Sequence, residues 1–109
     1  MKINLSVIIP VYNAKKTLET SINSVVKQDI RIKNFLIEII LIIDDGKRYE
    51  KIIPKIRNGV SIKIIKTKGI KTGPGNARNL GIQKASGKYI GFLDADDEWS
   101  ENYINNMYN

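Results

Sequence analysis

Two runs of seven residues, apolar at almost every position, most restrict how this chain folds. They are Leu5–Val11, with the sequence LSVIIPV, and Ile37–Ile43, with the sequence IEIILII, in which Glu38 is the exception. A strand that is apolar at consecutive positions is buried on both faces, which is typical of a parallel sheet covered by helices. The two runs therefore predict neighbouring strands inside a parallel sheet.

Segments of helical and strand periodicity alternate along the rest of the chain. The expected elements are a helix around Leu18–Val26 capped by Asn13, a short or kinked helix within 47–57, a strand at 60–65, a helix at 76–86 that Gly87 stops, a strand at 88–93 and a helical segment after Ser100. Pro54 disfavours a regular helix in 47–57. Strands that alternate with helices favour an α/β fold, here a mostly parallel four-stranded sheet flanked by helices.

The composition limits the chemistry. The chain of 109 residues contains neither cysteine nor histidine. Disulfides and a cysteine zinc site are therefore excluded, and the most common general base and metal ligand is missing. Any metal must be held by oxygen ligands, which favours magnesium, manganese or calcium. The length and the lack of an internal repeat predict a single domain.

The formal net charge of +7 is concentrated between Gly46 and Gly75. Nine basic residues stand there against Glu50 alone: Lys47, Arg48, Lys51, Lys55, Arg57, Lys63, Lys66, Lys68 and Lys71. The favoured interpretation is a solvated lysine-rich face, and the alternative is a face that rests on phosphates or on the inner leaflet of a membrane. Nucleic acid is disfavoured as a partner because aromatic residues are not interleaved with this segment.

No apolar run approaches the ~18–20 residues that span a bilayer. The first residues, MKINLSVIIPVYN, show no small-residue cleavage site and fit a core strand better than a signal peptide. We therefore expect a cytoplasmic protein, with the inner face of the membrane as a place of peripheral association.

Residues with chemical potential follow the ends of three predicted strands. They are Pro10, Val11, Tyr12 and Asn13 at the first, Asp44 and Asp45 at the second, and Asp94, Ala95 and Asp96 at the fourth. Parallel sheets bind ligands beyond the carboxyl ends of their strands, at a topological switch point. We therefore expect these residues to meet at one edge of the sheet.

The spacing of Asp94 and Asp96 lets both carboxylates address one ligand, because alternate residues of an extended segment point the same way. Magnesium or manganese typically takes one or two carboxylates together with water and phosphate oxygens. Such a metal stabilises negative charge on a leaving group, while a carboxylate after the second strand accepts hydrogen bonds from a nucleobase or ribose. The structural alternative is an acidic start of a helix.

Three further features support a phosphate ligand more weakly. Tyr12 is placed either to stack on a base or to pack at the rim of the core. The turn formed by Gly73, Pro74, Gly75 and Asn76 precedes a helix, whose N-terminus attracts anions, but it lacks the P-loop pattern. Arg78, in the first turn of that helix, pairs either with a phosphate or with Asp44 and Asp45.

Three segments together resemble the inverting family 2 glycosyltransferases, which have the GT-A fold. They are SVIIPVYNAKKTLETSINSVVKQ, EIILIIDDG and GPGNARNLGIQKASGKYIGFLDADDEW, in this order and spacing, and they cover nearly the whole chain. The resemblance implies that residues 1–109 form a single Rossmann-like GT-A domain that binds a nucleotide sugar. It implies a UDP- or dTDP-activated donor, with a UDP-sugar favoured, and Mg2+ or Mn2+ as cofactor.

The resemblance also implies roles for the residues at the strand ends. Pro10 and Tyr12, with Val11 and Asn13 beside them, would line the base and ribose pocket, Asp45 would read the base and Asp44 would support the turn. Arg78 and the turn Gly73–Asn76 would lie near the nucleotide. Asp94, Ala95 and Asp96 would form the D-x-D motif, with Asp96 as direct metal ligand and Asp94 on ribose or on metal-bound water.

Two departures from the family pattern shape the expected function. The DDG motif continues as Lys47, Arg48 and Tyr49 instead of Ser followed by Thr or Asp, so the loop beside the nucleotide is unusual. In the family the catalytic base and the acceptor site lie downstream of the D-x-D, and no candidate for the base is found here. We therefore expect the donor-binding half of a longer transferase, inactive alone towards a glycan or lipid-linked acceptor.

Exposed apolar surface where an acceptor half belongs would favour self-association into a homo-oligomer. Two alternatives stay open at this point. One is a non-catalytic module that binds nucleotide sugars. The other is a receiver-like phosphoacceptor domain, whose acidic pair would follow the first strand, where this chain has Pro-Val-Tyr-Asn.

Overall fold

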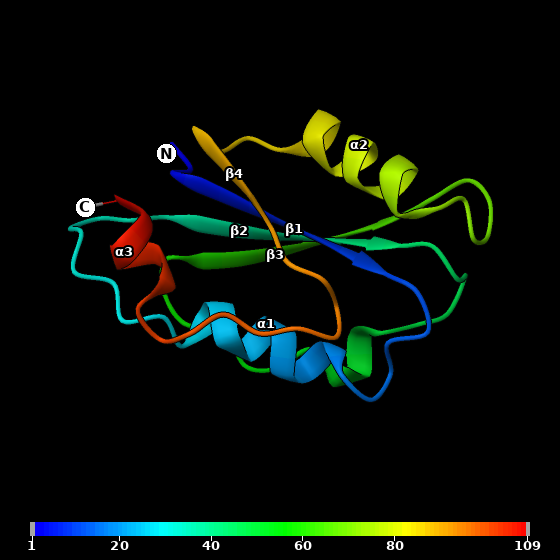
Figure 1. Ribbon diagram of the computed structural model, residues 1–109, viewed down its shortest axis with the longest axis horizontal. Coiled ribbons are helices and arrows are strands. Elements are labelled where there is room, and N and C mark those ends of the chain that lie inside the picture. The colour runs from blue at the N-terminus through cyan, green and yellow to red at the C-terminus, as the bar shows by residue number, and fades with distance from the viewer. Residues whose placement is uncertain (1, 109) are drawn as a thin grey trace.

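A computed structural model describes residues 2–108 and shows a four-stranded, fully parallel sheet (Figure 1). The strands are β1 (Leu5–Val11), β2 (Ile37–Ile43), β3 (Val60–Lys66) and β4 (Tyr89–Phe92), in the spatial order β3-β2-β1-β4. The chain moves outward from β1 to β3 and then returns to the other side of β1. The predicted α/β fold is confirmed, and the switch point lies between β1 and β4.

Helices cover both faces of the sheet. Helix α1 (Leu18–Val26) packs on one face and α2 (Pro74–Lys84) on the other, as Figure 1 shows, while α3 (Tyr103–Tyr108) lies by the amino ends of the strands. The side chains of β1 and β2 alternate between the two layers. Val7 and Ile39 face α1, whereas Ile8 and Ile40 belong to the smaller cluster that includes Ala77 of α2. This double burial explains the continuous apolar runs.

Three of the predicted helices differ from the structure, in their form, their cap or their bounds. Segment 47–57 forms only one 3-10 turn, η1 (Glu50–Ile52), and Ile53 before Pro54 is already extended because a residue that precedes proline avoids the helical region. Asn13 does not cap α1, since Thr17 occupies the N-cap position and Asn13 lies earlier with a positive φ of 52°.

The predicted helix at 76–86 is displaced towards the N-terminus. It begins at Pro74, because proline has no N–H to lose at the first helical position and its φ suits a helix. It ends at Lys84, so Gly87 is not its stop. Gly87 instead permits a close approach: a Cβ there would lie 2.6 Å from the backbone nitrogen of Ser6. The following strand spans 89–92 and not 88–93.

Glu38 is buried on the α2 side of the sheet and fully satisfied by hydrogen bonds. It accepts them from Ser6 Oγ and the Ser86 backbone N–H, each at 2.6 Å, and pairs with Lys63 Nζ at 2.9 Å. Burial alone would raise the pKa of Glu38, but the contacts with Ser6, Ser86 and Lys63 outweigh it and lower the pKa. These contacts fix the segment after α2 to the sheet.

Among residues 2–108, no helix is long and apolar enough to span a bilayer.

Candidate functional site

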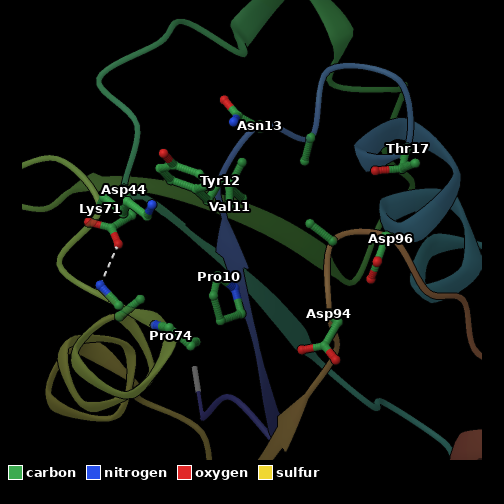
Figure 2. A pocket seen from close by; sticks show the side chains of 14 residues that line it. Pro10, Val11, Tyr12, Asn13, Thr17, Asp44, Lys71, Pro74, Asp94 and Asp96 are labelled. Atoms are coloured by element: carbon green, nitrogen blue, oxygen red, sulfur yellow. Dashed lines mark hydrogen bonds between the residues drawn. The ribbon is translucent and has the colours of Figure 1, made fainter.

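A cavity of about 540 Å³ opens at the carboxyl ends of β1 and β2, beside the segment that follows β4. Its lining consists of Pro10, Val11, Tyr12, Asn13, Ala14, Thr17, Asp44, Lys71, Gly73, Pro74, Ala77, Asp94, Ala95 and Asp96. Figure 2 shows Asp94 and Asp96 on one side of this space, with Asp44, Lys71 and Pro74 on the opposite side. The sheet topology thus brings together strand ends that are far apart in sequence.

Most of the residues singled out from the sequence line this cavity, but four do not. Asp45, Gly75, Asn76 and Arg78 lie outside the lining. Asn76 donates a hydrogen bond to Thr72 Oγ1, and Arg78 pairs with Asp94 at 3.3 Å and not with Asp44 or Asp45.

Sequence reasoning missed four lining residues: Ala14, Thr17, Lys71 and Ala77. Ala77 was detectable in principle, because it lies in the first turn of the helix that begins at Pro74. No sequence signal marks Lys71, whose place depends on a left-handed φ of 57°.

Asp44 holds the loop that forms one wall of the cavity. Its Oδ1 accepts hydrogen bonds from Thr67 Oγ1 at 2.8 Å and from Thr72 Oγ1 and N at 2.7 and 3.0 Å, while Oδ2 accepts one from Gly73 N at 2.9 Å. Asp44 is only 4% exposed. Burial would raise its pKa, but the hydrogen bonds from Thr72, Thr67 and Gly73 outweigh it and lower the pKa. Asp44 therefore stays ionised and keeps residues 67–73 in place.

Asp45 lies behind the cavity wall. Its Oδ2 accepts hydrogen bonds from the Asn13 backbone N–H at 2.8 Å and from the Tyr49 hydroxyl, and its Oδ1 accepts one from Lys47 N at 2.9 Å. Burial would raise the pKa of Asp45, but the hydrogen bonds led by that from Tyr49 lower it. Both carboxylate oxygens are thus used within the protein, and a contact between Asp45 and a nucleobase stays a prediction.

Asp94 and Asp96 form an open pair at the rim. Both are exposed, and the Asp94 side chain is 62% accessible although it pairs with Arg78. Residues 2–108 contain no group of three or more His, Cys, Asp or Glu side chains able to enclose a metal ion. Two exposed carboxylates beside a cavity do fit magnesium or manganese, because these ions keep several waters and take their remaining ligands from phosphate oxygens.

We expect acid to destabilise the protein through Glu38, Asp44 and Asp45. All three have lowered pKa values in the folded state, so the unfolded chain, with ordinary values near ~4, binds more protons below about pH 5. Their stabilisation is complete above the unfolded pKa and is lost as the pH falls through the folded pKa. Urea unfolding at several pH values from 7 to 3 measures this. A free energy of unfolding that stays constant or rises down to pH 3 would contradict the expectation.

Comparison with known proteins gives a consistent assignment. The family model described as Glycosyl transferase family 2 matches residues 6–109. The minor teichoic acid biosynthesis protein GgaA of Bacillus subtilis is 40% identical over 114 residues, which is 94% of this chain and 24% of that protein. The poly(ribitol-phosphate) beta-N-acetylglucosaminyltransferase TarS of Staphylococcus aureus is 33% identical over 102 residues, 92% of this chain and 16% of TarS.

Solved structures agree with the sequence comparison. The crystal structure of S. aureus TarS 1-349 in complex with UDP-GlcNAc superposes with a TM-score of 0.82 and 28% identity, over 97% of this chain and 30% of that one. The complex of the same protein with UDP also gives a TM-score of 0.82. This chain thus spans less than a third of the length of these relatives.

Proposed function

This chain belongs to glycosyl transferase family 2, and we propose that its cavity binds the nucleotide of a UDP-sugar donor for transfer to a glycan or lipid-linked acceptor. The single observation that carries the proposal is the meeting of Tyr12, Asp44 and the Asp94–Asp96 pair around one cavity at the sheet's switch point. Support comes from the solved TarS complexes with UDP and UDP-GlcNAc, which share this fold. A receiver-like phosphoacceptor domain is a different class of protein, and the family match does not support that alternative.

The two sides of the cavity suit the two parts of a nucleotide. Tyr12, 43% exposed at the cavity, offers a ring face to the base, and Asp44 Oδ2, which accepts one internal hydrogen bond, offers a further acceptor lone pair nearby. Lys71 and the uncapped N-terminus of α2 supply positive potential for the diphosphate. In this arrangement the base would lie by Tyr12 on the β1–β2 side, and the diphosphate would lie between Lys71 and the N-terminus of α2 on one side and the Asp94–Asp96 pair on the other.

Asp94 and Asp96 are the residues that would hold Mg2+ or Mn2+. When bound, the metal would neutralise charge on the departing nucleoside diphosphate. Arg78, 3.3 Å from Asp94, orients that carboxylate and offsets its charge. The transfer itself needs a base on the acceptor hydroxyl, and we assign no residue of this chain to that role.

The acceptor proposal is a phosphate-bearing glycan polymer. Support comes from the printed functions of two relatives, minor teichoic acid biosynthesis for GgaA and poly(ribitol-phosphate) glycosylation for TarS. The basic stretch between Gly46 and Gly75 has the charge to attract such a polyanion. The same charge would favour peripheral contact with an anionic membrane surface.

Calorimetric titration with UDP, dTDP and GDP, each with and without manganese, tests the donor proposal. We expect UDP with manganese to bind most tightly, because the TarS complexes that share this fold hold UDP and UDP-GlcNAc and because manganese would join the diphosphate to the Asp94–Asp96 pair. A thermal unfolding transition recorded on the same sample shows that the chain is folded. No binding of any nucleotide by the folded chain would contradict the proposal.

A further inference from the structure

Two loops beside the cavity are joined by a hydrogen-bond network centred on Tyr49. Its hydroxyl donates to Asp45 Oδ2 and accepts from the Ala14 backbone N–H at 3.2 Å. Asp45 Oδ2 also accepts from the Asn13 backbone N–H at 2.8 Å, and Lys47 Nζ donates to Asn13 Oδ1 at 2.8 Å. We call this set of five residues, Asn13, Ala14, Asp45, Lys47 and Tyr49, the Tyr49 latch. It connects the loop after β1 to the loop after β2.

The loop after β1 needs such support. Asn13 has a φ of 52°, in the small left-handed region, which non-glycine residues populate rarely although asparagine does so more often than most. The successive backbone N–H groups of Asn13 and Ala14 donate to Asp45 Oδ2 and to the Tyr49 hydroxyl, and not to carbonyls of a helix. Tyr12, Asn13 and Ala14 line the cavity at the same time. The conformation of this wall therefore depends on acceptors that the other loop supplies.

The acceptors are themselves buried and do not belong to the lining. Tyr49 is 1% and Asp45 8% exposed, and neither lines the cavity. Lys15 Nζ lies 4.3 Å from the centre of the Tyr49 ring and donates to the Arg48 carbonyl. Lys15 thus adds a further contact between the two loops. A buried network of this kind is costly to leave partly unsatisfied. Tyr49 directly follows Lys47 and Arg48, the two positions at which the DDG motif departs from the common family pattern.

We propose that Tyr49 is a positioning residue for the donor site. Acting through Asp45 and the Ala14 N–H, its hydroxyl holds the cavity wall of residues 12–14 in the conformation that accepts a nucleoside. Tyr49 and Asp45 do so without contacting the nucleotide, so they support every nucleoside diphosphate to the same extent. This inference rests on the proposed function, because it concerns the same cavity.

Tyr49→Phe is the variant that tests the inference, because it keeps the buried ring and removes only the hydroxyl. With manganese present, we expect affinity for UDP and for GDP to fall by the same factor, roughly 3- to 10-fold, as expected for a hydrogen-bond contribution. Affinity for pyrophosphate with manganese should not change, because pyrophosphate has no nucleoside to contact the wall of residues 12–14. Tyr108→Phe is the matched control: its hydroxyl is buried without a partner among the described residues, so its removal should leave all three affinities unchanged.

A second variant separates positioning from base reading. Asp45→Asn keeps the size of the side chain but removes a carboxylate oxygen that accepts two hydrogen bonds. A positioning role predicts an equal loss for UDP and GDP, whereas a carboxylate that reads the base would change the ratio of the two affinities. A changed ratio, or an unchanged UDP affinity in Tyr49→Phe, would overturn the inference.

Hydrogen exchange of the ligand-free protein provides a readout that does not need nucleotide binding. The amides of Asn13 and Ala14 should exchange faster in Tyr49→Phe than in the wild type, while the Asp44 amide just after β2, which donates to the Val11 carbonyl, keeps its protection. If the wild type binds no nucleotide, the proposed function fails, and the exchange of these two amides still decides whether the latch holds the loop. Unchanged exchange at both amides would overturn the inference.

Discussion

Replacing Asp44 with alanine is expected to lower the free energy of unfolding by about 3 kcal/mol. The carboxylate accepts four hydrogen bonds from the loop of residues 67–73, and it is almost completely buried. Alanine would leave these four donors without an acceptor in a place that water reaches poorly, and the loop would lose its attachment to the sheet. Urea unfolding followed by circular dichroism at pH 7 measures the change.

Asp29→Ala is the matched control, since it removes the same charge from a half-exposed side chain. Within residues 2–108 the Asp29 side chain pairs only with the exposed Arg31, at 3.3 Å, and such surface pairs contribute at most about 1 kcal/mol. Equal destabilisation by both substitutions would show that lost charge, and not the lost attachment of the loop, explains the Asp44 result. The Asp44 variant should also lose nucleotide affinity at temperatures where it is still folded, because Lys71 and Gly73 belong to the released wall.

The sheet was predictable because the information for it is local. In Leu5–Val11 and Ile37–Ile43, consecutive apolar residues indicate burial on both faces, and the structure has these two strands with the same bounds. Segment 47–57 carried an apolar helical pattern, yet only Glu50–Ile52 forms a helical turn, while Tyr49, Ile52 and Ile53 pack into the core from the segment around it. Tertiary contacts override local propensity there, and no local pattern reveals them.

The site was predictable to the extent that topology decides it. Parallel strands place their carboxyl ends at one edge of the sheet, so Tyr12, Asp44 and Asp96 could be grouped from the sequence alone. The roles of neighbouring carboxylates could not be separated in this way. Asp44 faces the cavity and Asp45 faces Tyr49 because of contacts with residues 67–73 and 13–14, and these contacts join segments far apart in the chain.

Asp96→Ala should remove the manganese-dependent part of UDP binding, lowering affinity in the presence of manganese by roughly 10- to 100-fold. Without metal, the substitution should not lower the affinity for UDP. Asp96 then only repels the diphosphate, so its removal should leave UDP affinity unchanged or raise it slightly. Calorimetric titration of wild type and variant with UDP, with and without manganese, measures both effects. Because Asp96 is exposed, we expect the variant to fold normally.

Asp97→Ala separates metal binding from general electrostatics. Asp97 is the next residue, equally charged and also exposed, but it lies outside the cavity lining and its Oδ1 accepts a hydrogen bond from Glu98 N at 2.8 Å. If Asp96 holds the metal, the manganese dependence disappears in Asp96→Ala and persists in Asp97→Ala. If the two carboxylates act only through the field around the cavity, both variants change affinity alike, since their charges differ little in position. The second result would exclude Asp96 as a metal ligand and leave the diphosphate to Lys71 and the N-terminus of α2.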